Sequence, residues 1–412
     1  MADHITSAVV AGPHGRERGA RRPSFFLMFI FLGVVAASLL ILKFAPAPFF
    51  WGGLAWAAAL WVAIIGVHGS WPRAILLNLG IVAIMLAGAE VYITANEYTS
   101  PTLSDDFYVP NDVLGWAPAK GIGHGFKAGP AGLFHGPKGV LFDVDYTIDP
   151  NGLRTAPPWG KDDLAGTVLF FGCSFTFGEG LKNNETLPYQ VGALSGGRYR
   201  TFNFGVGGYG PEQMLAEIER GVVQRVVDTP PRYAFYTAIP NHVWRVAGRV
   251  AWGGNAPRYV LDADGTVHQA GNLGDREPLA LRLGLGRRVD AQLKKSAAWQ
   301  TLSMGDYRIT DEDLRLYFAV VLRSQELLKA QYPGIQFRVI LWPSMSGGQQ
   351  PVTYDKLRDG FRRMGIQVDL AEDILPGYST DRSPFILSSA DKHPNARADR
   401  MIAQYVLNQI SQ

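Results

Sequence analysis

The segment TVLFFGCSFTFGEG, residues 167–180, joins a run of large apolar residues to a glycine-rich turn. Such a run is typical of a buried strand, and the glycines around Cys173 and Ser174 predict a tight turn into a helix. A serine in this position can attack an acyl carbon, or it can simply cap the helix that follows. The second glycine of the Gly-x-Ser-x-Gly pattern is missing, so the segment does not indicate an α/β-hydrolase elbow.

Beyond this segment, strand and helix patterns alternate to the end of the chain, which predicts an α/β fold whose parallel sheet is covered on both faces. The expected strands are residues 167–171, 200–206, 232–239, 335–343 and 366–370, and the expected helices are 211–227, 311–332, 353–365 and 396–410. The alternation breaks at about 245–310, which we interpret as an insertion. Within it, residues 257–271 predict a β-hairpin that turns at DADG.

Three apolar segments precede this region: Phe25–Leu42, Phe49–Val67 and Ala74–Ile93. Each has roughly the 20 residues that a membrane-spanning helix needs. The sequence therefore predicts a cytoplasmic tail over 1–24, three transmembrane helices over 25–95, and an irregular lead-in rich in Gly and Pro over 96–160, in which YTIDPNGLRT (146–155) predicts a short strand and a turn. The α/β domain follows over 161–412.

The positive charges near these segments predict their orientation. Four arginines precede the first segment and Arg73 lies between the second and third, which favours a cytoplasmic N-terminus. The α/β domain is then expected outside the cytoplasm, as in an integral protein of a bacterial-type inner or plasma membrane. Glu90, in the third segment, is close enough to its outer end to reach the interface.

Composition disfavours several other classes of protein. The net charge of +3 is a mild excess and does not indicate a nucleic-acid partner, whose binding would need a clustered basic face. A single cysteine excludes an intramolecular disulfide and Cys-rich zinc patterns, and the eight histidines are scattered, so neither a metal nor a cofactor is expected.

The glycine pattern Gly205-x-Gly207-x-x-Gly210 matches a dinucleotide fingerprint. That fingerprint requires an acidic residue at the end of the following strand, whereas Asp228 precedes the strand. The loop is therefore more typical of a site that points backbone N–H groups at a developing oxyanion.

Polar residues follow several of the expected strands, where sites form in open parallel sheets. Ser174 follows the first strand, an Asn-Gly loop (Asn203–Gly210) follows the second, and Asn241 follows the third. Asp391 and His393 precede the last helix. Singly, each has a structural explanation as a turn or helix-cap residue. Together they place a nucleophile, a base with its carboxylate, and oxyanion donors in one chain.

These four stretches resemble the sequence blocks of the SGNH, or GDSL-like, hydrolases. GCSFTFGEG is similar to the first block and implies Ser174 as the nucleophile. NFGVGGYG is similar to the second and implies Gly208 as the oxyanion-hole glycine. IPNHVWR implies Asn241 as a further donor, and DKHPN implies His393 as the base with Asp391 as its acid.

The resemblance implies a flavodoxin-like, three-layer α/β/α fold and ester chemistry. DVLGWAPAKG and YTIDPNGLRT also resemble the segment that precedes the catalytic domain in membrane-attached members. Two family aspartates are replaced, by Cys173 and by His242. The Asp391–His393 spacing of two is shorter than the more frequent three.

The sequence therefore predicts a membrane-anchored, extracytoplasmic serine esterase that hydrolyses O-acetyl esters, with cell-envelope carbohydrate as the expected substrate. Two alternatives stay open, an O-acyltransferase that acetylates a polysaccharide and a non-catalytic module that binds a glycan or an envelope protein. Four tryptophans are compatible with sugar binding and equally with packing: Trp244, Trp252, Trp299 and Trp342. The oligomeric state, the ester and the acyl group are not indicated.

Overall fold

The computed structural model describes residues 48–66, 69–96, 102–103, 107–128, 139–159, 164–250, 252–276, 309–343, 350–389 and 391–411. The chain divides into two compact units, Met1–Val91 and Tyr92–Gln412.

The described part of the first unit contains helices α2 (Pro48–Gly66) and α3 (Ser70–Asn96, which runs on into the second unit). One stretch, Ser70–Ala89 in α3, is long and apolar enough to cross a membrane. The apolar run of α2, Gly53–Ile64, is shorter than the roughly 20 residues that a span requires. Among the described residues the three predicted spans therefore reduce to one candidate. The first predicted span, 25–42, and the side chain of Glu90 lie outside the described residues.

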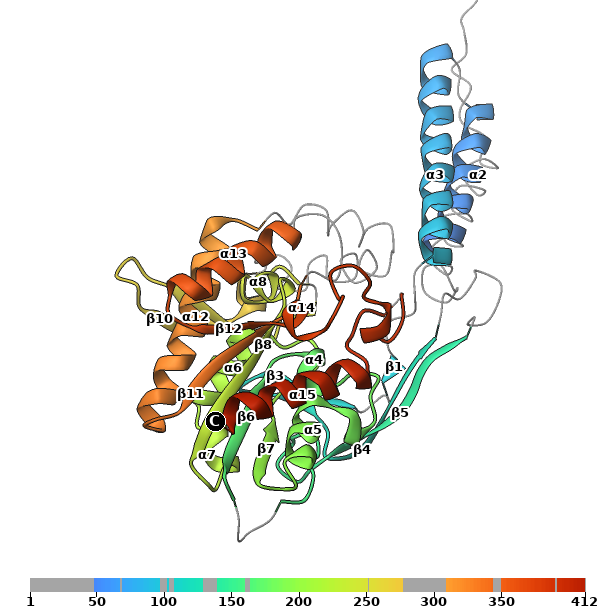
Figure 1. Ribbon diagram of the computed structural model, residues 1–412. Coiled ribbons are helices and arrows are strands. Elements are labelled where there is room, and N and C mark those ends of the chain that lie inside the picture. The colour runs from blue at the N-terminus through green and yellow to red at the C-terminus, as the bar shows by residue number, and fades with distance from the viewer. Residues whose placement is uncertain are drawn as a thin grey trace, which may run out of the picture. The chain divides into compact units, whose positions relative to one another are not determined.

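A five-stranded parallel sheet forms the centre of the second unit (Figure 1). Its strands are β6 (Gly166–Phe171), β7 (Tyr199–Asn203), β8 (Pro231–Ala238), β11 (Gln336–Leu341) and β12 (Gln367–Leu370). They lie in the order β12-β11-β8-β6-β7. In chain order this is 2-1-3-4-5, the doubly wound order of flavodoxin-like sheets.

Alternate residues of β6 enter two separate cores, because successive side chains of a strand point to opposite faces. Leu169 and Phe171 pack with one set of helices, and Val168 and Phe170 pack with the other. The first set is α6 (Pro211–Glu219), α8 (Asn241–Val246), α12 (Asp311–Gln331) and α13 (Gln350–Arg363). The second is α5 (Leu187–Leu194), α14 (Ala371–Ile374) and α15 (Ala396–Ile410). The described region is thus an α/β/α sandwich.

The lead-in is more regular than predicted. It contains five strands: β1 (Thr102–Leu103), β2 (Tyr108–Asn111), β3 (Gly115–Pro118), β4 (Gly121–Ala128) and β5 (Val140–Ile148). The short strand expected in YTIDPNGLRT is confirmed as the end of β5. Antiparallel pairing of β4 with β5 and of β2 with β3 satisfies their backbone groups despite the many glycines. Through Arg154, which bridges both Ile148 and Asn203, the lead-in reaches the β7 edge of the central sheet.

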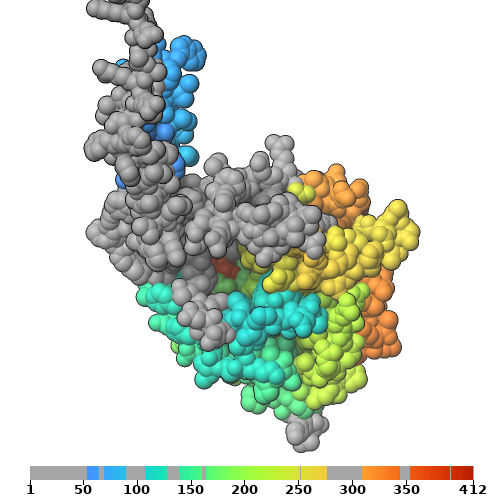
Figure 2. Space-filling model, turned by 180° about the vertical axis from the view of Figure 1, so that it is seen from behind, coloured from blue at the N-terminus to red at the C-terminus, as the bar shows by residue number. Residues whose placement is uncertain are grey.

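Two further elements bear on the predicted pattern. The helix expected over 211–227 is divided into α6 and α7 (Val222–Val226), because Gly221 adopts a left-handed conformation at φ 70°. The hairpin predicted at DADG is confirmed as β9 (Pro257–Leu261) and β10 (Val267–Asn272). Figure 2 shows this segment (yellow) beside the lead-in strands (cyan), where Gly115 lies against the backbone of Asn255.

Candidate active site

The turn after β6 presents Ser174 at the first position of the short helix α4 (Ser174–Phe177). Gly172 has a φ of 149°, and a Cβ there would lie 2.4 Å from Thr176 Oγ1, so the turn requires glycine. The Thr176 hydroxyl donates to the Phe171 carbonyl at 3.1 Å, which ties the helix back to its strand. The serine is therefore held by local backbone geometry.

Ser174, His393 and Asp391 form a continuous hydrogen-bonded chain. The Ser174 Oγ lies 2.7 Å from His393 Nε2, and His393 Nδ1 lies 2.5 Å from Asp391 Oδ1. These contacts join the C-terminal end of β6 to the loop before α15, 219 positions apart. The arrangement can remove the serine proton and stabilise the imidazolium that results.

Charges around the imidazole set its proton affinity. Burial alone would lower the pKa of His393, but the negative charges of Glu179 and Asp391 and the Asp391 hydrogen bond outweigh it and raise the pKa. Glu179 Oε1 is 4.0 Å from His393 Nδ1. Burial alone would raise the pKa of Asp391, but hydrogen bonds and charges from His393 and Lys127 hold it well below its ordinary value. Asp391 is thus the ionised partner.

The loop after β7 places Gly208 in a left-handed conformation, with φ 84°. Asn203 braces this loop, because its Nδ2 donates to the Thr176 carbonyl and its Oδ1 accepts from Gly205 N, both at 3.0 Å. Within the described part of the chain, neither the Ser174 nor the Gly208 backbone N–H donates to a protein acceptor. Two unengaged N–H groups at adjacent strand ends suit an oxyanion.

Asn241 opens α8 directly after β8. Its Oδ1 is buried and accepts no hydrogen bond from the described residues. The adjacent His242 is different in character. Its Nδ1 lies 2.6 Å from the Tyr236 hydroxyl, its ring stacks on that tyrosine, and burial lowers its pKa, so it is a neutral core residue.

Cys173 is fully buried in the core that contains Phe170 and Phe175. It makes no side-chain cap to α4, although its carbonyl accepts from Thr176 and Phe177. Its environment is that of a small apolar residue.

Three polar residues of the site were not identified from the sequence: Lys127, Arg154 and Glu179. Lys127 Nζ lies 2.8 Å from Asp391 Oδ2. The buried Arg154 guanidinium donates to the carbonyls of Phe177, Gly178 and Leu181 at 2.7, 2.6 and 2.5 Å. The only sequence signal was proximity: Glu179 stands five positions after Ser174, and Arg154 lies in the quoted stretch YTIDPNGLRT. Nothing distinguished Lys127.

The side chains of Glu179, Asp391 and His393 offer ligand atoms within 4.8 Å of one another. The His393 and Asp391 atoms already have hydrogen-bond partners in the protein. Both ring nitrogens of His393 are paired, and the Lys127 ammonium donates to the second Asp391 oxygen. A cation would have to displace Lys127, so the group fits acid–base chemistry better than metal binding.

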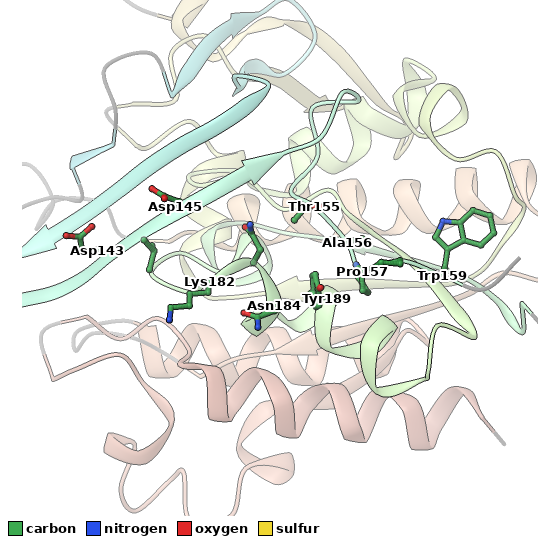
Figure 3. A pocket seen from close by; sticks show the side chains of 12 residues that line it. Asp143, Asp145, Thr155, Ala156, Pro157, Trp159, Lys182, Asn184 and Tyr189 are labelled. Carbon is green, nitrogen blue, oxygen red and sulfur yellow. The ribbon is translucent and has the colours of Figure 1, made fainter.

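A separate cavity of about 880 Å³ lies between β5 and the start of α5 (Figure 3). Asp143, Asp145 and Lys182 line it together with the aromatic side chains of Trp159 and Tyr189. No member of the Ser-His-Asp chain is among its lining residues, so this cavity is not where Ser174 would meet a substrate.

No family model matches the sequence, and no curated protein matches it. Among solved structures, a member of the lipolytic G-D-S-L family from Veillonella parvula is similar, with 15% identity and a TM-score of 0.34 over 60% of this chain and 98% of the other. A GDSL-like lipase from Bacteroides thetaiotaomicron has 14% identity and a TM-score of 0.32 over 60% and 88%. A carbohydrate esterase has 12% identity and a TM-score of 0.33 over 65% and 70%. At TM-scores below 0.5 the likeness assigns no activity to this chain.

Proposed function

We propose that this protein is a membrane-attached serine esterase of the SGNH type, with Ser174 as nucleophile, His393 as base and Asp391 as its orienting acid. The observation that carries the proposal is the hydrogen-bonded chain from Ser174 Oγ through the imidazole to the Asp391 carboxylate, at 2.7 and 2.5 Å.

The proposed reaction has two halves. Ser174 Oγ attacks the ester carbonyl carbon while His393 Nε2 takes the hydroxyl proton. The oxyanion is held by the N–H groups of Ser174 and Gly208 and by the Asn241 amide. The imidazolium returns the proton to the departing alkoxide, which leaves an acyl-serine. Water, activated by the same imidazole, then releases the acid.

The proposed substrate is an O-acetylated carbohydrate. Trp252 is 53% exposed, and its indole lies within 3.1 Å of the point where a Cβ on Gly208 would stand. A flat, accessible ring beside the oxyanion glycine offers an apolar surface for a sugar ring. Trp342, in contrast, is buried against Phe175, and Trp299 lies outside the described residues.

The test of the esterase is covalent labelling of the full-length protein in detergent. A fluorophosphonate probe should label the wild type but not Ser174→Ala, and p-nitrophenyl acetate hydrolysis should fall about 10⁶-fold in that variant, as in other serine hydrolase triads. Ser379→Ala, which alters an exposed serine, is the control. An unlabelled but folded wild type would instead indicate a non-catalytic glycan- or envelope-binding module.

An O-acyltransferase is the second candidate, because Trp252 could equally hold an acceptor sugar whose hydroxyl replaces water. Adding a defined oligosaccharide to an acetyl donor should then convert acetate release into acetylated oligosaccharide, detected by mass spectrometry. Release of acetate at an unchanged rate, without acetylated sugar, would exclude the acyltransferase in favour of the esterase.

We further propose that the chain is integral to the membrane through α3, with an extracytoplasmic catalytic domain. Support comes from α3, whose candidate span carries many exposed apolar side chains, among them Leu77, Ile81 and Met85. An alkaline phosphatase fused after residue 96 should be active, whereas a fusion after residue 69 should not. The opposite pattern would indicate that the catalytic domain lies on the cytoplasmic side.

A further inference from the structure

One charged side chain of the lead-in contacts the hydrogen-bonded Ser174–His393–Asp391 group. Lys127, on β4, places its ammonium 2.8 Å from Asp391 Oδ2. The two side chains are only 12% and 1% exposed. They lie 264 positions apart in the sequence, so this contact exists only because the β4–β5 hairpin packs on the catalytic domain.

With Lys127 in place, both oxygens of the Asp391 carboxylate accept hydrogen bonds from the protein. Oδ1 receives the His393 ring N–H and, at 3.1 Å, the His393 backbone N–H. Oδ2 receives the Lys127 ammonium. A buried carboxylate oxygen left without a donor is costly, so Lys127 satisfies the oxygen that faces away from the imidazole, while the two His393 donors hold Oδ1.

We propose that Lys127 is a positioning residue of the active site, which holds Asp391 toward His393 Nδ1 and offsets the second negative charge that Glu179 brings to the imidazole. This proposal rests on the proposed esterase function and goes beyond it, because it assigns a part of the active site to the segment that precedes the catalytic domain.

The balance of charge gives the proposal a measurable consequence. The charged groups that face His393 are Asp391 from its own loop, Glu179 from the turn after α4, and Lys127 from β4. Tyr146 from β5 lies nearby as a neutral phenol, because burial raises its pKa far above neutrality. When His393 is protonated, two anions and two cations balance. Without Lys127 the surroundings are more negative, so the imidazole should keep its proton to higher pH.

The experiment compares pH profiles of kcat/KM for p-nitrophenyl acetate in the full-length protein, followed at the isosbestic wavelength of p-nitrophenol. In Lys127→Met the acid limb should move to higher pH, because only the neutral imidazole can act as base. At neutral pH, kcat/KM should fall about 10-fold to 100-fold, a part of the 10²–10⁴ that a general base supplies.

Two further variants separate charge from packing. Lys127→Arg keeps the positive charge and should return the acid limb to the wild-type position. Lys356→Met removes a lysine from an exposed ion pair with Asp311, 2.9 Å long, and should leave the profile unchanged. A structural role alone would lower the melting temperature without moving the limb.

The outcomes are distinct. A wild-type profile in Lys127→Met would overturn the proposal, as would an acid limb in Lys127→Arg that coincides with that of the methionine variant. If the methionine variant does not fold, Lys127→Gln takes its place. Acid limbs at the same pH in Lys127→Gln and Lys127→Arg would also overturn the proposal. Failure of the esterase proposal itself would appear separately, as a wild type that the fluorophosphonate does not label.

Discussion

Two regions reach the candidate active site by different routes, the loops at the carboxyl ends of β6, β7 and β8 and the β4–β5 hairpin of the lead-in. The first region supplies Ser174, Gly208 and Asn241 from adjacent strands of one sheet. The second supplies Lys127 to Asp391 and, through the following segment, Arg154 to the carbonyls at and just after the end of α4. The strand-end loops present the proposed nucleophile and oxyanion donors, and the lead-in contacts Asp391 and the nucleophile loop from outside the sheet.

The first prediction tests the strand-end region, where we expect the largest effect. In Asn241→Ala, kcat should fall about 10²–10³-fold with little change in KM, because an oxyanion donor acts mainly in the transition state. Steady-state kinetics on p-nitrophenyl acetate measure this. Asn408→Ala, at an exposed position of α15, is the matched control. A loss that appears in KM alone would place Asn241 in substrate binding instead.

The second prediction tests the lead-in through Arg154. Arg154→Met should lower the free energy of unfolding by about 2–4 kcal/mol, because three carbonyls lose a charged donor. Its guanidinium also lies 4.5 Å from the Tyr146 ring centre, and burial lowers its pKa only to about 10, so it stays charged at neutral pH.

Chemical denaturation measures this loss of stability. Arg232→Met, which removes a guanidinium bound to one carbonyl at an exposed site, should change stability by no more than about 0.5 kcal/mol. Equal effects for the two arginines would show that the lead-in does not brace the nucleophile loop.

The third prediction concerns pH and sharpens the comparison between Glu179 and Lys127. Glu179 raises the pKa of His393, so Glu179→Gln should lower it and move the acid limb of kcat/KM to lower pH. Activity is lost as the pH falls through the pKa of His393, because the protonated imidazole cannot act as base. A lower pKa should therefore extend activity into more acidic buffer. The direction is opposite to that expected for Lys127→Met. An acid limb at the wild-type pH would show that the charge of Glu179 does not affect the pKa of His393.

The smallest effect on activity is expected at Cys173. Cys173→Ser should keep kcat within about threefold, while burial of a hydroxyl costs about 1–3 kcal/mol of stability. Activity and thermal denaturation are measured on the same preparation. A variant that is folded but inactive would return the thiol to consideration as a reacting group.

Much of the fold could be predicted because strands and helices leave local patterns. The apolar run before Gly172, the spacing of apolar residues in α15, and the DADG turn all lie within short windows of sequence. The break at Gly221 and the lead-in strands before β5 were missed. A glycine inside a helical pattern does not reveal its φ, and a glycine-rich strand such as β4 lacks the usual β-branched signal.

For the site, the chain by itself determined which groups stand at strand ends, since a parallel sheet gathers those ends at one edge and Ser174 and Asn241 each follow a recognisable strand, while His393 precedes a recognisable helix. Only the tertiary structure decided what surrounds them. The pairing of Lys127 with Asp391 and of Arg154 with the loop carbonyls depends on docking of the lead-in. Charge and hydrogen-bond partners across such distances in sequence are selected by packing, and no local pattern encodes them.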